Sequence, residues 1–176
     1  MSLNNQTVFL PKCHCKACHS NDHKFSRLDH CNSVFAGLPA DQVTQLQQIQ
    51  NNAAHLVMKK RKPDHAKPLL KELHWLPVKF CCQYKTATLA YRQFEGSLPL
   101  YLSSSLCTYE PSRSLRYSKE KLLKIPKRNL ESFGDRSFSF MAPPVWNSLL
   151  ADLRNLPTLS QFKSNFKTFL FAQALP

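Results

Sequence analysis

Apolar residues recur at every third or fourth position after Asp41, which is the spacing of one face of an α-helix. Six residues make up this apolar stripe: Val43, Leu46, Ile49, Ala53, Leu56 and Val57. The opposite face carries four glutamines that are expected to face water: Gln42, Gln45, Gln47 and Gln48. Asp41 can cap the first turn, and the helix is expected to end in a basic run just before Pro63. We predict that this helix packs through its apolar stripe.

Four further segments show the same spacing and predict helices at 25–35, 67–74, 78–94 and 158–171. Gly96 is the expected stop of the third, because glycine readily adopts the left-handed conformation that ends a helix. In the last segment five residues are expected to face inward: Leu159, Phe162, Phe166, Phe169 and Leu170. Residues 107–132 are expected to form an extended connector with one short strand at 122–125. The predicted fold is mainly α, an irregular bundle of five to seven helices.

The length of 176 residues fits one domain with an appended arm. Residues 1–24 are polar, rich in Cys and His and without a helical period, so we expect a disordered arm there. The helical region is expected to span 25–171, followed by a short tail at 172–176. The chain has only three glycines, which lie far apart, and this excludes a dinucleotide-binding turn and a Walker-type phosphate loop.

Positive charge dominates the composition. Lys and Arg number 24 against 11 Asp and Glu, which gives a formal net charge of +13. Such an excess favours a polyanionic partner, most simply nucleic acid, although a basic protein without such a partner remains an alternative. The sequence has neither an apolar run long enough to span a membrane nor a convincing signal peptide, so we expect an intracellular protein, nuclear or cytoplasmic, with reduced cysteines.

Two basic stretches are the candidate nucleic-acid contacts. The first, at the expected end of a helix, consists of Lys59, Lys60, Arg61 and Lys62. Phosphate contact, a nuclear-localisation patch and a solvated helix end all remain open for it. The second stretch, 112–128, holds a single acid and seven basic residues: Arg113, Arg116, Lys119, Lys121, Lys124, Lys127 and Arg128. We expect it to contact a polyanion, because it is polar and long enough to track a phosphate backbone.

The N-terminal arm contains a candidate zinc site. Cys15 and Cys18 have C-x2-C spacing, and His23 follows after four residues, as in a zinc knuckle. Cys13 can complete a tetrahedral set, so the candidate ligands are Cys13, Cys15, Cys18 and His23. The alternative is that this arm is out-of-frame sequence that binds no metal.

Aromatic residues crowd the second half of the chain: Phe133, Phe138, Phe140, Trp146, Phe162, Phe166 and Phe169. Their helical spacing favours a core over a set of base-stacking rings. Asp135 is expected to cap the helix that follows it. No nucleophile stands next to a base in a local motif, so a hydrolase is not expected.

Seven motifs follow one another along the chain: SRLDHCNS (26–33) leading to GLP, QNNAAHLV (50–57), LKELHWLPV (70–78), PSRSLR (111–116), FGDRSF (133–138), WNSL (146–149) and FKS (162–164). In this order they resemble the region that follows the polymerase palm in reverse transcriptases of LINE-class non-LTR retrotransposons, nearest to the jockey and chicken-repeat lineages. His30 and His55 depart from the pattern, which has Tyr and Arg there. The resemblance implies a helical thumb and tail that grip a template–primer duplex, with RNA or an RNA–DNA hybrid as the partner and no small-molecule substrate.

Polymerase catalysis in this family requires two adjacent aspartates in a turn, because they hold two metal ions. No two of the six aspartates in this chain are neighbours. We therefore expect a non-catalytic remnant of a reverse transcriptase that binds nucleic-acid backbone with little base specificity. Two alternatives are an incomplete gene model of an active RNA-directed DNA polymerase, and a helical interaction module whose apolar faces at 43–57 and 159–170 pack on a missing palm domain.

Overall fold

The computed structural model describes residues 37–60, 65–110, 121–126 and 137–175. These residues form seven helices and no strand: α2 (Ala40–Val57), α3 (Ala66–Glu72), α4 (Val78–Glu95), α5 (Leu100–Ser103), α6 (Phe138–Asn147), α7 (Ala151–Arg154) and α8 (Leu159–Ala174). The prediction of a mainly α fold is therefore confirmed. The expected arm at 1–24 and the expected helix at 25–35 lie outside the described residues.

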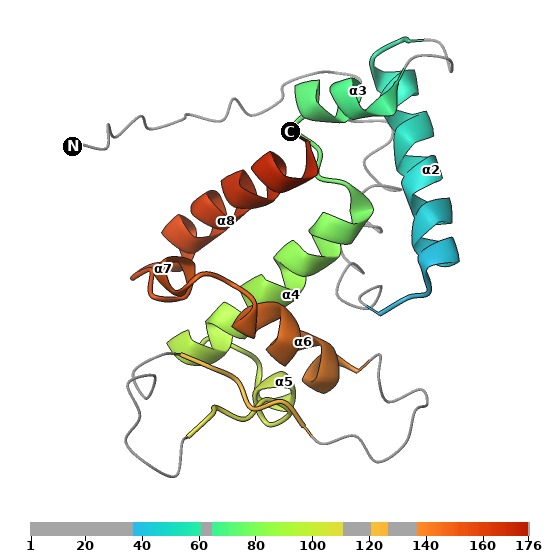
Figure 1. The fold of residues 1–176 in the computed structure, drawn as a ribbon. Helices are drawn as coiled ribbons and strands as arrows, with labels where there is room; N and C mark the ends of the chain where they lie inside the picture. Colours follow the sequence, from blue (N-terminus) through green and yellow to red (C-terminus); the bar gives the residue numbers. More distant parts are fainter. Residues whose placement is uncertain (1–36, 61–64, 111–120, 127–136, 176) are drawn as a thin grey trace, which may run out of the picture.

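Helix α4 is the centre of the fold. It runs through the middle of the molecule, with α8 beside it and α6 crossing near its C-terminal end (Figure 1). Helices α2 and α3 pack on each other, and α2 also contacts α4. The core thus forms where α6 and α8 meet α4.

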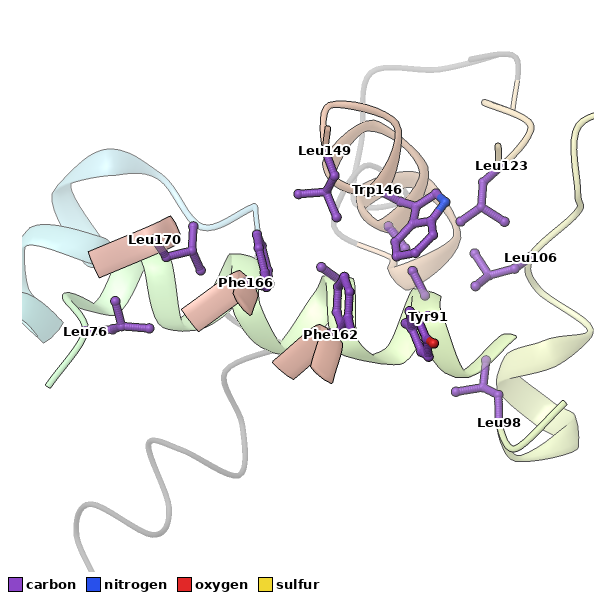
Figure 2. Packing of buried hydrophobic residues seen from close by; sticks show 13 residues of the cluster. Leu76, Tyr91, Leu98, Leu106, Leu123, Trp146, Leu149, Phe162, Phe166 and Leu170 are labelled. Atoms are coloured by element: carbon purple, nitrogen blue, oxygen red, sulfur yellow. The ribbon is translucent and has the colours of Figure 1, made fainter. Parts of the chain in front are cut away.

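Aromatic rings fill this core. Trp146, Phe162 and Phe166 are almost completely buried, and Tyr91 of α4 lies beside Trp146 and Phe162 (Figure 2). The ring of Tyr91 stacks on Phe162 with centroids 4.6 Å apart, while Phe94 stacks on Trp146 at 5.3 Å. The predicted aromatic core is confirmed for these residues. The expectation that Phe169 faces inward is wrong, because its side chain is 39 % exposed and stacks on Phe166 from outside the core.

The hydroxyl of Tyr91 also connects the core to the turn before α8. It donates a hydrogen bond of 2.7 Å to the backbone oxygen of Leu156. A buried phenol needs such a partner, because a polar group removed from water without one is costly. Burial, with the nearby Glu95 carboxylate as a second cause, raises the pKa of Tyr91 above its ordinary value.

Helices α2, α3 and α4 end with the same hydrogen-bond pattern, the Schellman motif. A residue with positive φ follows each helix: Lys59 (51°), His74 (54°) and Gly96 (69°). At the end of α2, the Lys59 N–H donates to Leu56 O at 3.3 Å and the Lys60 N–H donates to His55 O at 3.0 Å. The predicted stop at Gly96 is confirmed, while the other two helices end in this way without a glycine.

Helix α2 packs through a different face from the predicted apolar stripe. Its buried residues are Gln50, Ala54 and His55, whereas Ile49 and Leu56 are 55 % and 68 % exposed. At the N-terminal end of the stripe, Val43 and Leu46 pack against the buried side chains of Val78 and Cys82 in α4. The prediction failed because two glutamines of α2 make hydrogen bonds to another segment, and these bonds set the orientation of the helix.

Those glutamines hold the entry to α4. The Gln50 Nε2 donates to the backbone oxygen of Leu76 at 2.8 Å, and the Val78 N–H donates to Gln47 Oε1 at 2.9 Å. The two side chains also bind each other, with 2.9 Å between Gln47 Nε2 and Gln50 Oε1. The expectation that Gln47 faces water was wrong, because Gln47 satisfies an N–H group in the first turn of α4 that the helix itself leaves without an acceptor.

Candidate nucleic-acid interface

The structure describes four of the eleven candidate nucleic-acid-binding residues: Lys59, Lys60, Lys121 and Lys124. The other seven lie outside the described residues: Arg61, Lys62, Arg113, Arg116, Lys119, Lys127 and Arg128. The interface can therefore be built from the two lysines that end α2 and from the segment 121–126.

Lys59 and Lys60 sit at the C-terminal end of α2 with exposed side chains. Their backbone N–H groups close the Schellman motif, and their ammonium groups lie near the negative end of the helix dipole. Lys59 and Lys60 therefore form a capped and solvated helix end, which is one of the interpretations that the sequence leaves open for them. Both ammonium groups also remain accessible to a phosphate.

The segment 121–126 is paired with residues 107–109. The Tyr109 N–H donates to Leu122 O at 2.9 Å, and the Lys124 N–H donates to Cys107 O at 2.8 Å. Thr108 and Leu123 form an isolated antiparallel bridge between these two hydrogen bonds. The expected strand at 122–125 is therefore only a single bridge within the described part of the chain.

Two side chains of α6 hold the same segment from the other side. The Asn147 Nδ2 donates to Leu123 O at 2.8 Å, and the Leu123 N–H donates to Asn147 Oδ1 at 3.0 Å. The Trp146 Nε1 donates to Lys121 O at 2.6 Å. We call these three hydrogen bonds the α6 clamp. Asn147 thus occupies both backbone groups of Leu123, while the bridge uses the oxygen of Leu122 and the N–H of Lys124 on either side of it.

The α6 clamp fixes part of the basic stretch on the core. The side chain of Leu123 is 1 % exposed and lies beside Trp146 and Leu106 (Figure 2). Lys124 follows directly and is exposed, while Lys121 is half-buried. Burial of one leucine and three hydrogen bonds thus place these two lysines relative to α6.

This arrangement could be predicted from the sequence only in part. The prediction that Trp146 lies in the core is confirmed, but the sequence alone names neither a partner for its indole N–H nor a role for Asn147. The WNSL motif (146–149) was the available signal, because a buried Trp requires a hydrogen-bond acceptor. The acceptor lies 25 residues away, at Lys121, so no local pattern identified it.

The candidate zinc ligands Cys13, Cys15, Cys18 and His23 lie outside the described residues. In the described part of the chain, no group of three or more His, Cys, Asp or Glu residues is placed to hold a metal ion. Asp135, the expected helix cap, also lies outside, and α6 begins after Ser137 without a side-chain cap. Asp41 does not cap α2 as expected, because Pro39 occupies the cap position and Asp41 lies in the first turn.

A hollow of about 470 Å³ lies between α2, α4 and α6, away from the basic segment. Its lining is mainly apolar and includes Val43, Cys82 and Met141, with Lys79 as a charged residue. Burial raises the pKa of the Cys82 thiol to about 11, which keeps it protonated at neutral pH. The described lining holds no His, Asp or Glu that could act as a base toward this thiol.

Comparisons of the chain with protein-family models, with curated protein sequences and with solved structures found no match in any of the three. Among the helices that the structure describes, none is both long and apolar enough to cross a membrane.

Proposed function

We propose that this chain binds nucleic-acid backbone through its basic connector, without catalysis, in the manner of the region that follows the palm of non-LTR reverse transcriptases. The net charge of +13 and the ordered series of motifs support the proposal. RNA or an RNA–DNA hybrid is the proposed partner. Contact is made with phosphates, so binding discriminates little between base sequences.

The observation that carries this proposal is the α6 clamp on the basic segment. A lysine on a fixed backbone gives up less conformational freedom when it binds a phosphate than a lysine on a mobile one. Lys124 is exposed directly next to Leu123, whose backbone N–H and oxygen are both bonded to Asn147. The WNSL motif supplies Trp146 and Asn147, and both side chains bond to the described part of the basic stretch.

The test is binding of the purified chain to a labelled RNA–DNA hybrid, measured by fluorescence anisotropy at several salt concentrations. Log affinity is expected to fall linearly with log salt, because each neutralised phosphate releases counterions. The double variant Lys121→Glu, Lys124→Glu is expected to weaken binding and to reduce the slope. Lys67→Glu is the matched control, because Lys67 is an exposed lysine of α3 outside both basic stretches. An absence of binding by the unmodified chain at low salt would refute the proposal.

A second candidate function, an interaction module, rests on one observation about the two apolar faces. The α8 face is occupied within the fold, because Phe162, Phe166 and Leu170 are buried in the core. On α2, by contrast, Ile49 and Leu56 lie one above the other and are exposed. A module that needs a missing palm domain is expected to melt without cooperativity when it is isolated. A sharp cooperative melt of the isolated chain would count against this candidate.

A further inference from the structure

The bridge between residues 107–109 and 121–124 sorts their side chains onto two faces. Side chains alternate along an extended segment, so the residues that flank Thr108 and Leu123 lie on the face opposite Leu123. That face carries Cys107 and Tyr109 on one segment and Leu122 and Lys124 on the other. Because Leu123 points into the core, the opposite face turns toward solvent, and Tyr109 is 48 % exposed there.

Tyr109 and Lys124 are diagonal neighbours across this pair of segments. The hydrogen bonds place Tyr109 opposite Leu122 and Lys124 opposite Cys107. Diagonal positions are about 7–8 Å apart, within the reach of an aromatic ring and a long side chain. Glu110, the acid nearest to Tyr109 in sequence, lies beyond the bridge and is exposed. The shared face thus combines an aromatic surface with a positive charge.

We infer that Tyr109 and Lys124 form a binding site for an unpaired nucleotide, with the Tyr109 ring stacked on the base and the Lys124 ammonium on a neighbouring phosphate. This inference rests on the proposed function and narrows it to nucleic acid with unpaired bases. Inside a duplex both faces of each base are covered by its neighbours, so a protein ring has no base to stack on. A single strand offers such a surface at each base, whatever the sequence.

The α6 clamp makes this site more effective than an exposed tyrosine on a loose loop. Asn147 fixes the backbone of Leu123, and the two bridge hydrogen bonds hold the backbones of Tyr109 and Lys124 in place beside it. Tyrosine has only two side-chain torsions to restrict on binding. The entropy lost when the ring stacks is therefore small.

The experiment compares a labelled single-stranded RNA with a blunt RNA–DNA hybrid of the same sequence, in anisotropy titrations at fixed salt. The unmodified chain is expected to bind the single strand more tightly. Tyr109→Leu keeps an apolar side chain but removes the ring, and it is expected to weaken single-strand binding at least about fivefold and to leave hybrid binding unchanged. Tyr109→Phe keeps the ring and is expected to retain the preference. Lys124→Gln is expected to weaken binding to both ligands.

The outcomes separate this inference from the proposed function. If the unmodified chain binds neither nucleic acid at low salt, the proposed function fails and the inference fails with it. If it binds both equally and Tyr109→Leu changes neither affinity, the proposed function survives and the inference alone is overturned. A circular-dichroism melt of Tyr109→Leu that matches the unmodified chain shows that the variant is folded. If this variant unfolds, Tyr109→Phe decides, because loss of its single-strand preference would overturn the stacking role.

Discussion

The carboxamide of Asn147 pairs with the backbone of Leu123 as a neighbouring strand would. Its Nδ2 donates to Leu123 O at 2.8 Å, and its Oδ1 accepts the Leu123 N–H at 3.0 Å. One side chain thereby satisfies both backbone groups of a residue whose own side chain is 1 % exposed. Without it, two buried backbone groups would lack partners, which is among the costlier defects a protein can contain.

Replacement of this carboxamide tests the α6 clamp. In Asn147→Asp the donor becomes an oxygen that faces Leu123 O, so one hydrogen bond is lost and two acceptors meet. We expect the free energy of unfolding to fall by about 2–3 kcal/mol. Urea unfolding measures it, with Asn52→Asp as the control, because Asn52 is exposed in α2. If the two variants are equally stable, the clamp does not stabilise the fold.

The two glutamines that hold the entry to α4 give a second prediction. Gln50→Leu keeps the size of the side chain but removes the amide donor to the oxygen of Leu76, which then keeps only the Cys81 thiol at 3.2 Å, and it removes an acceptor of Gln47. We expect a loss of about 1 kcal/mol in the free energy of unfolding, because two hydrogen bonds of Gln50 are lost and a thiol is the weaker donor that remains to Leu76. Gln48→Leu, on the exposed face of the same helix, is the control and should change stability little. Equal effects of both substitutions would mean that Gln50 contributes only helix propensity.

A substitution at the end of α2 is expected to stabilise the protein. Lys59 has a φ of 51°, a conformation that is strained for a residue with a Cβ and free for glycine. Lys59→Gly should raise the free energy of unfolding by about 0.5–1 kcal/mol. Lys60→Gly, one residue on and without positive φ, should not stabilise. Thermal melts of the two variants measure the difference, and a destabilised Lys59→Gly would contradict the prediction.

Cys82 and Cys107 should differ in reactivity. Burial raises the pKa of the Cys82 thiol from 9.0 to about 11, whereas Cys107 is exposed. Because the thiolate is the nucleophile, iodoacetamide at pH 8 should label Cys107 well before Cys82, as read by peptide mass mapping. Unfolding in urea should remove the difference. Equal labelling of the native protein would show that Cys82 is open to solvent.

The raised pKa of the Cys82 thiol also makes the free energy of unfolding depend on pH. Between pH 9 and about 11 the unfolded thiol of Cys82 ionises while the folded one keeps its proton. The folded state then binds more protons than the unfolded state, so stability falls as pH rises through this window. Cys82→Ala should flatten this part of the profile, measured as urea midpoints from pH 8 to pH 11. A profile identical to that of the unmodified chain would contradict the assignment.

Elements with local signals could be predicted from the sequence, and elements oriented by distant partners could not. The helix that ends at Gly96 depends on apolar spacing and a nearby glycine, and both lie within one segment. The orientation of α2 depends on the hydrogen bond from Gln50 to Leu76, 26 residues away. A polar side chain that is buried because it is paired cannot be told from one that faces water until its partner is placed.

The same reasoning applies to the candidate site. The basic residues could be listed from the sequence, because charge is a property of each residue alone. The role of Asn147 could not, because it depends on Leu123, which lies 24 residues earlier and becomes a partner only after folding. The pairing of Tyr109 with Lys124 likewise needs the bridge at Thr108 and Leu123 to be known.

The α6 clamp also sets the register of the segment that it holds. A slip of 121–126 by one residue would turn Leu123 outward and point Lys124 into the core, since adjacent side chains face opposite ways. In other proteins the register of two paired strands is commonly set by a tight turn between them. Here it is set by one carboxamide, which offers its donor and its acceptor to a single residue of the segment. Asn147 therefore helps to determine which side chains of the segment 121–126 reach the surface.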